Sequence, residues 1–254
     1  MPGSTPQHLN TSTLQHPVSI TFARMNTPLQ IFEEGQVLLI DKPLEWTSFD
    51  AVRKIRNLIR IKKVGHAGTL DPLASGLLIV CTGKFTKRIN EYMAQEKEYT
   101  GHFTLGTTTP TYDLESTPEH PRPFDHLTAE QIHAATLPFT GEIMQVPPAH
   151  SAIKVEGKRV YELARAGKEV KLEPRRLTIY TFEITRIELP VVEFRVVCST
   201  GTYIRSLAHD FGQALGCGAH LSRLRRTRIG AFRADEAETL QAFEERVRQL
   251  RSAL

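Results

Sequence analysis

The sequence predicts an α+β domain in which helices pack on a mixed, mostly antiparallel sheet. Residues 97–106 alternate Tyr, Gly, Phe and Leu with polar side chains, the period of a strand with one buried face. Residues 176–189 and 191–199 also have strand character and are separated only by Pro190, which predicts an antiparallel pair. Residues 201–216 instead place apolar side chains at helical spacing.

The first half of the chain predicts a strand, a helix and a second strand. The strand is QVLLIDKP, residues 36–43. Thr47 and Asp50 have the spacing of a capping box, so a helix is expected to begin there. LLIVC, residues 77–81, predicts a buried strand. The apolar face of the helix consists of Val52, Ile55, Leu58 and Ile59.

The remaining segments predict loops and short helices. Residues 107–126 contain four prolines and are expected to form a loop. Thr128 is expected to cap a short helix, and a further helix is predicted around residues 161–165. Gly216 ends the helix that begins after residue 201, and residues 237–254 predict a closing helix.

Composition indicates an ordinary globular chain of 254 residues with a net charge of +4. The three cysteines lie far apart without a C-x-x-C pair, which favours reduced thiols and a cytoplasmic protein over disulfides or a zinc cluster. No apolar run is long enough to span a membrane. Residues 1–30 lack the pattern of a signal peptide, are rich in Pro, Ser, Thr, Asn and Gln, and predict a mobile tail.

GHAGTLDPLASGLLIV, residues 65–80, contains an unusual acid. Asp71 is the only carboxylate from residue 51 to residue 90, a segment that holds nine Lys or Arg. Pro72 biases Asp71 toward an extended backbone, and the nearby glycines permit close approach of a ligand. The side chain could simply bond its own turn. Alternatively, it is a reactive carboxylate on a stiff turn.

Other carboxylate chemistries fit the segment less well. Metal-assisted hydrolysis needs further acids nearby, and none follows within this stretch. A glycosidase needs a second carboxylate at a set distance, which the sequence neither shows nor excludes. The glycines lack the lysine of a phosphate-binding P-loop. A single nucleophilic or general-base carboxylate remains.

Two basic segments, residues 53–63 and 223–233, carry eleven positive charges and no acid. Such runs are often a solvated helix face and a surface loop. Because the Asp71 loop begins directly after the first run, we expect the two segments to bind a phosphate backbone.

The segment GHAGTLDPLASGLL resembles the catalytic motif of the TruB family of tRNA pseudouridine synthases. The resemblance extends from Ile31 to Phe232 and includes four further motifs. It implies a pseudouridine synthase fold and the isomerisation of uridine within RNA. In that reaction uracil is detached from C1′, rotated and rejoined through C5, which requires neither a metal nor a redox cofactor. The supporting motifs are LLIDKPLEWTSFDAV, KEYTGHFTLGTTTPTYD, QVPPAHSAIKVEGKRVYELARAG and GTYIRSLAHDFGQALGCGAHLSRLRRTRIG.

The resemblance assigns roles residue by residue. It makes Asp71 the nucleophile and Arg205 the group that holds it ionised and oriented. Tyr99 is expected to stack on the flipped base and is a candidate acceptor of the sugar proton. Tyr203 and Leu224 complete the pocket. The space vacated by the base is assigned to His66, while Lys42 and Lys154 are expected to be scaffold or phosphate contacts without a catalytic role.

The same resemblance implies the T-arm of tRNA as partner, position 55 as target and a monomer. It divides the chain into the tail, a catalytic domain over residues 31–232 and a short C-terminal helix over 233–254. Those last residues are too few for the RNA-binding domain of PUA type that many members carry. Two alternatives stay open: a tRNA-folding chaperone, and a synthase acting on another RNA such as ribosomal RNA.

Overall fold

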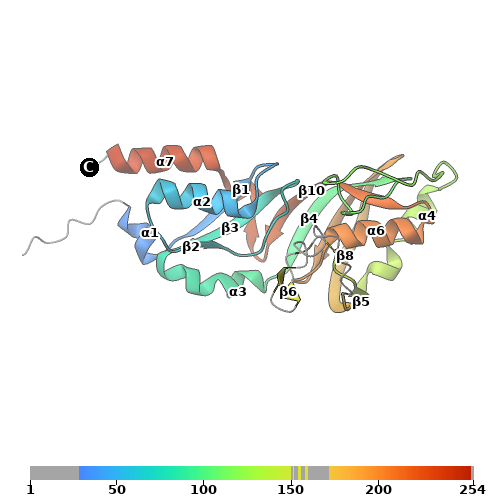
Figure 1. Cartoon of the computed structure of the whole chain (residues 1–254), viewed down its shortest axis with the longest axis horizontal. Helices are drawn as coiled ribbons and strands as arrows, with labels where there is room; N and C mark the ends of the chain where they lie inside the picture. The colour runs from blue at the N-terminus through green and yellow to red at the C-terminus, as the bar shows by residue number, and fades with distance from the viewer. Residues whose placement is uncertain (1–28, 150, 152–153, 156–157, 160–171, 253–254) are drawn as a thin grey trace, which may run out of the picture.

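The computed structural model describes residues 29–149, 151, 154–155, 158–159 and 172–252. These residues form a mixed sheet that runs along an elongated molecule, with helices packed on it (Figure 1). The α+β class predicted from the sequence is therefore confirmed.

One sheet of ten strands dominates the fold. Its main path passes through β12 (Glu238–Thr239), β1 (Val37–Lys42), β3 (Ala74–Thr82), β10 (Ala219–Ile229), β4 (Lys97–Leu105), β9 (Val191–Cys198), β8 (Arg175–Glu188) and β5 (Gly141–Gln145). The short strands β2 (Val64–His66) and β11 (Phe232–Arg233) pair with β3 and β10. Neighbours are antiparallel except for β1 with β12 and β3 with β10, which are parallel.

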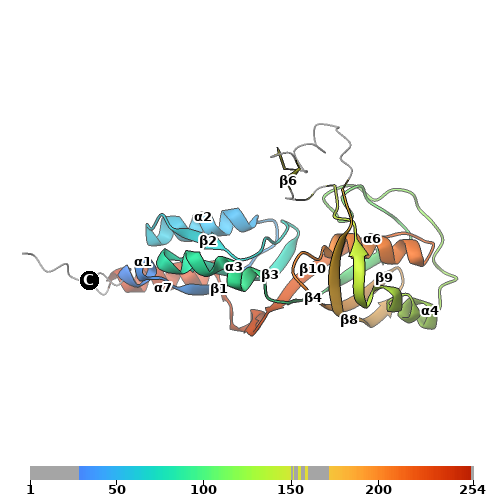
Figure 2. The same ribbon diagram turned by 90° about the horizontal axis from the view of Figure 1, so that it is seen from below.

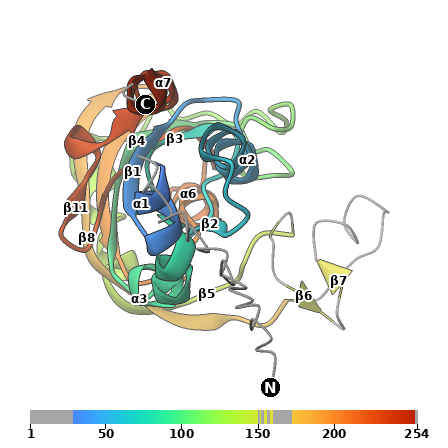
Figure 3. The ribbon, with the colours of Figure 1, turned by 90° about the vertical axis from the view of Figure 1, so that its left-hand side faces the viewer.

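Helices are distributed over both halves of the sheet. α1 (Gln30–Glu34), α2 (Ser48–Ile59), α3 (Ile89–Met93) and α7 (Leu240–Ser252) surround the half built on β1 and β3, and α4 (Ala129–Ala134) and α6 (Ile204–Ala214) lie at the other (Figure 1). Viewed end-on, the sheet curves around α2 and α6 (Figure 3). The pair β6 (Lys154–Val155) and β7 (Lys158–Arg159) stands apart from it (Figures 2 and 3). In the described part of the chain, no helix is long and apolar enough to cross a membrane.

The local helix signals are confirmed. Thr47 Oγ1 accepts a hydrogen bond from the Asp50 amide at 3.0 Å, and the Asp50 carboxylate accepts one from the Thr47 amide at 3.1 Å. This capping box begins α2. Thr128 caps α4 in the same way, through Gln131. The apolar stripe of α2 packs into a core with β1, β3 and α7.

Four further expectations have outcomes that differ. One interpretation of the basic segment 223–233 was a surface loop. The segment instead lies mostly in β10 at the centre of the sheet, and Arg226 is only 1% exposed. The closing helix begins at Leu240, because Glu238–Thr239 pairs with β1 as strand β12. The predicted mobile tail and the helix around residues 161–165 fall on residues outside the described ones, Leu29 and Gln30 excepted.

The parallel contact between β3 and β10 requires a glycine. Gly76 faces Arg226 in the register and has a φ of +101°. A Cβ atom at this position would lie 2.3 Å from the Arg226 carbonyl oxygen, so a side chain would force the strands apart. Gly76 therefore permits the two strands to lie side by side near Asp71.

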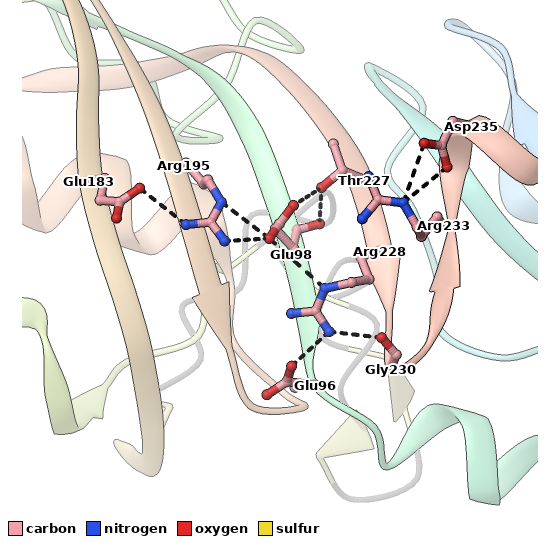
Figure 4. Close-up of polar contacts among 9 residues, drawn as sticks. All are labelled: Glu96, Glu98, Glu183, Arg195, Thr227, Arg228, Gly230, Arg233 and Asp235. Atoms are coloured by element: carbon pink, nitrogen blue, oxygen red, sulfur yellow. Dashed lines mark hydrogen bonds and ion pairs between the residues drawn. The ribbon is translucent and has the colours of Figure 1, made fainter.

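A ladder of charged groups crosses one face of the sheet (Figure 4). Arg195 on β9 lies 2.7 Å from a carboxylate oxygen of Glu98 on β4 and 3.1 Å from one of Glu183 on β8. Thr227 on β10 donates to Glu98 at 2.8 Å. Partial burial acts to raise the pKa of Glu98, but hydrogen bonds from Thr227 and Arg195 outweigh it, and the pKa lies below its usual value.

We expect Glu98→Gln to lower the free energy of unfolding by about 1 kcal/mol at pH 7, because a charge-assisted network is broken. A carboxylate with a depressed folded-state pKa contributes stability above its unfolded pKa and loses that contribution as pH falls through the folded value. The difference between wild type and variant should therefore shrink from pH 6 to pH 3 in urea titrations. Glu183→Gln, at the exposed end of the ladder, should cost less. An undiminished difference at pH 3 would contradict this account.

Candidate active site

Asp71 lies in a turn directly before β3. The Ala74 amide donates to the Asp71 carbonyl at 3.0 Å and closes the turn. The Asp71 side chain remains 37% exposed and lines a cavity of about 310 Å³. The Asp71 carboxylate is therefore accessible from the cavity and is carried by a hydrogen-bonded turn.

Two residues, one at the end of β1 and one at the start of α2, hold this turn. Ser48, the first residue of α2, donates to the Leu70 carbonyl at 3.1 Å and accepts from the Leu70 amide at 2.8 Å. Lys42 is fully buried, and its ammonium donates to the carbonyls of Pro43, Trp46 and Pro72. Burial lowers the pKa of Lys42 to about 8, although the negative charge of Asp71 acts to raise it. Lys42 is thus placed as a scaffold residue, whereas the side chain of Lys154 lies outside the described ones.

Arg205 lies in the first turn of α6 and is 5% exposed. Its Nε is 2.9 Å from an oxygen of Asp71 and 3.6 Å from an oxygen of Asp113. Its Nη1 also donates to the Thr111 carbonyl at 3.3 Å. The guanidinium is therefore fixed between two carboxylates and can orient Asp71.

The other predicted pocket residues come from separate elements. Tyr99 on β4 and Leu224 on β10 both line the cavity and are buried. Tyr203 precedes α6, and its amide and carbonyl are both bonded to the side chain of Gln145, at 2.8 and 3.1 Å. Burial raises the pKa of Tyr99, so the phenol is protonated at neutral pH. The structure thus brings Asp71, Tyr99, Tyr203, Arg205 and Leu224 together around one cavity.

His66 is the predicted site residue that does not line this cavity. It lies on β2, paired with Val80 of β3, two residues before the segment that does. Burial lowers the pKa of its imidazole.

Sequence reasoning missed three residues of the site. Asp113 contacts Arg205, and its only signal in the sequence was its place at the end of the motif KEYTGHFTLGTTTPTYD. Lys97 and Arg226 line the cavity and are 5% and 1% exposed. Burial, with the charge of Arg226, lowers the pKa of Lys97 to about 8. Neither residue carries a local pattern that separates it from other basic side chains.

That segment 223–233 binds phosphate stays a prediction, but the structure shows that several of its cations are paired or buried while Arg223 and Arg233 are exposed. Arg225 pairs with Asp41 at 2.9 Å, Arg228 with Glu96 at 2.7 Å, and Arg226 is buried. In segment 53–63, Arg53 and Lys54 have acidic partners, while three cations remain exposed. Those exposed cations are Arg60, Lys62 and Lys63.

Comparison with known proteins identifies the family of the chain. Residues 56–204 match the model of the TruB family pseudouridylate synthase (N terminal domain), and residues 205–253 match that of the tRNA pseudouridylate synthase B C-terminal domain. The chain is 56% identical to tRNA pseudouridine synthase B of Flavobacterium johnsoniae, across 84% of this chain and 96% of that protein. It is 47% identical to the protein of the same name from Ralstonia pickettii, across 86% and 70%.

Two solved structures are also similar. One is a Cbf5-Nop10-Gar1 complex, with 34% identity and a TM-score of 0.67; the other is an H/ACA RNP bound to a substrate RNA containing 2'-deoxyuridine, with 31% identity and a TM-score of 0.64. The match covers 86% of this chain but only 56% of either of those chains. Together with the two family models, these relatives confirm the pseudouridine synthase fold. The chain belongs to the TruB family of tRNA pseudouridine synthases, enzymes that isomerise uridine to pseudouridine.

Proposed function

We propose that this chain isomerises the uridine at position 55 in the T-loop of tRNA, with Asp71 as nucleophile. The observation that carries the proposal is one accessible carboxylate, 2.9 Å from a buried arginine, at the wall of a cavity of about 310 Å³. The cavity volume of about 310 Å³ is at the lower end of the roughly 300–1,000 Å³ typical of small-ligand pockets. A uridine inside a folded loop must leave its stack to enter it.

The reaction can be written on these residues. An oxygen of Asp71 attacks C1′ of the sugar or C6 of the base, and the bond between C1′ and N1 breaks with its electron pair on N1. The base rotates within the cavity, C5 bonds to C1′, and Asp71 leaves. The proton of C5 passes to solvent while N1 gains a proton. Atoms therefore balance without a co-reactant.

The surrounding residues take supporting roles in this proposal. Arg205 orients the carboxylate, because its Nε contacts Asp71 directly. Tyr99 stacks on the base as a protonated phenol, and Tyr203 and Leu224 form walls that retain the detached ring. His66 occupies the space left in the RNA. His66 lies on β2, two residues before Gly68 at the start of the segment that lines the cavity, and this proximity in the chain supports the role.

We expect Asp71→Asn to abolish tritium release from tRNA labelled at C5 of uridine, by more than about a thousandfold, because an amide is a poor nucleophile. Binding of tRNA should remain within about threefold of wild type. Asp41→Asn is the matched control, since it changes another aspartate that pairs with an arginine at 2.9 Å but lies outside this cavity. Tritium release by Asp71→Asn at the wild-type rate would refute the nucleophile. A protein acting only as a tRNA-folding chaperone would release no tritium in either form.

We expect pseudouridine mapping of unmodified tRNA treated with the purified protein to show one new site, position 55. An isolated T-arm hairpin should also be a substrate, because the proposed reaction engages one flipped nucleoside of that arm. Ribosomal RNA fragments serve as the comparison substrate. Modification of ribosomal RNA in preference to the T-arm would assign the same chemistry to another RNA.

A further inference from the structure

Arg226 is the largest side chain that the fold buries completely, with 1% of its surface exposed. It lies on β10 and lines the cavity, yet no step of the proposed reaction uses it. Within the part of the chain that the structure describes, Arg226 donates hydrogen bonds to three main-chain carbonyls, also hydrogen-bonds the side chain of Tyr99, and forms no ion pair with a carboxylate. A buried charge with this set of partners needs an explanation.

The three carbonyls lie on both sides of Asp71 in the sequence. Arg226 Nε donates to Leu77 at 2.8 Å, in β3. Its Nη2 donates to Gly68 at 3.1 Å and its Nη1 to Thr69 at 3.4 Å, both before Asp71. Because the guanidinium is a rigid plane of donors, it fixes the two ends of the segment relative to each other.

The charge of Arg226 is unfavourable for its neighbours. Burial lowers the pKa of Lys97 and of Lys42 to about 8, and the positive charge of Arg226 contributes to both shifts. An apolar side chain of similar volume would fill the same space without this repulsion. It could not donate to the three carbonyls. The feature that distinguishes Arg226 is therefore its hydrogen-bonding geometry.

We propose that Arg226 is a positioning residue for the isomerisation, holding the segment from Gly68 to Leu77 so that the Asp71 carboxylate meets the reacting carbon. The inference rests on the proposed role of Asp71. Ser48 and Lys42 hold the carbonyls of Leu70 and Pro72 from the side of α2 and β1. Arg226 holds the same segment from the side of β10, so the turn is clamped between two parts of the fold.

The test compares Arg226→Lys with wild type in single-turnover tritium release and in tRNA binding. Lysine keeps the positive charge but cannot reach three carbonyls in one plane. A displacement of about 1 Å in a reacting group lowers a rate about a hundredfold. We expect the rate to fall about 10- to 100-fold, while the dissociation constant for tRNA stays within about threefold, and we expect Arg226→Gln to be slower still.

Arg195→Lys is the matched control. It removes the same fork of donors from a residue of the same sheet, but on β9, in the charged ladder with Glu98 and Glu183. Its rate should stay within about twofold of wild type. The melting temperature of every variant is measured first, so a loss of stability is separated from a loss of rate.

Hydrogen exchange gives a readout that does not depend on activity. In Arg226→Lys the amides of residues 66–74 should exchange faster, whereas those of β9 should not change. A wild-type rate, a loss confined to tRNA binding, or unchanged exchange in residues 66–74 would each overturn the proposal. Failure of both Arg226 variants to fold, with Arg195→Lys folded, would assign Arg226 to stability alone and also overturn it. If Arg226→Lys is normal while Asp71→Asn is inactive, only the positioning role fails.

Discussion

The parallel pairing of β3 with β10 is the constraint on which the site depends. It places Leu224 beside Ala74 and Arg226 beside Gly76, residues about 150 positions apart in the chain. β10 also pairs with β4, where Tyr99 is opposite Arg226. The beginning of β3, where Asp71 stands, thereby meets the aromatic and apolar walls of the cavity. The register excludes a Cβ at Gly76, so the close approach of the two strands and the position of the Asp71 carboxylate depend on the same glycine.

The two faces of the sheet treat charge differently. On the face with the ladder, Arg195 and Arg228 are matched by Glu98, Glu183 and Glu96, which favours stability. The residues lining the cavity include three cations and a single carboxylate, Asp71. Such an excess of positive charge lowers the stability of the fold, because buried cations that lie close together repel one another. Arg205 is paired with Asp71 and Asp113, whereas Lys97 and Arg226 form no ion pair among the described residues, so these two cations add positive charge beside the group that is proposed to attack the substrate.

Local patterns predicted the elements well because their causes are local. The box of Thr47 and Asp50 and the Pro-separated strands β8 and β9 depend only on neighbours in the chain. The basic run in β10 was predicted poorly, since a count of charges does not say which side chain faces inward. The partners of Arg225 and Arg226, Asp41 and three main-chain carbonyls, lie far away in the sequence and are brought close only by the sheet. For the same reason Asp113 could not be distinguished from any other loop acid until α6 placed Arg205 against it.

The way the turn is held also explains why the substrate must move. Ser48, Lys42 and Arg226 bond the main chain around Asp71 from three different elements. With the backbone fixed by tertiary contacts, the carboxylate has only its own side-chain torsions to adjust, and Arg205 restricts those. A group so constrained cannot follow a base into a stacked loop. In the proposed reaction the nucleoside is therefore brought to the cavity, so base flipping follows from the same contacts that hold the Asp71 carboxylate in place.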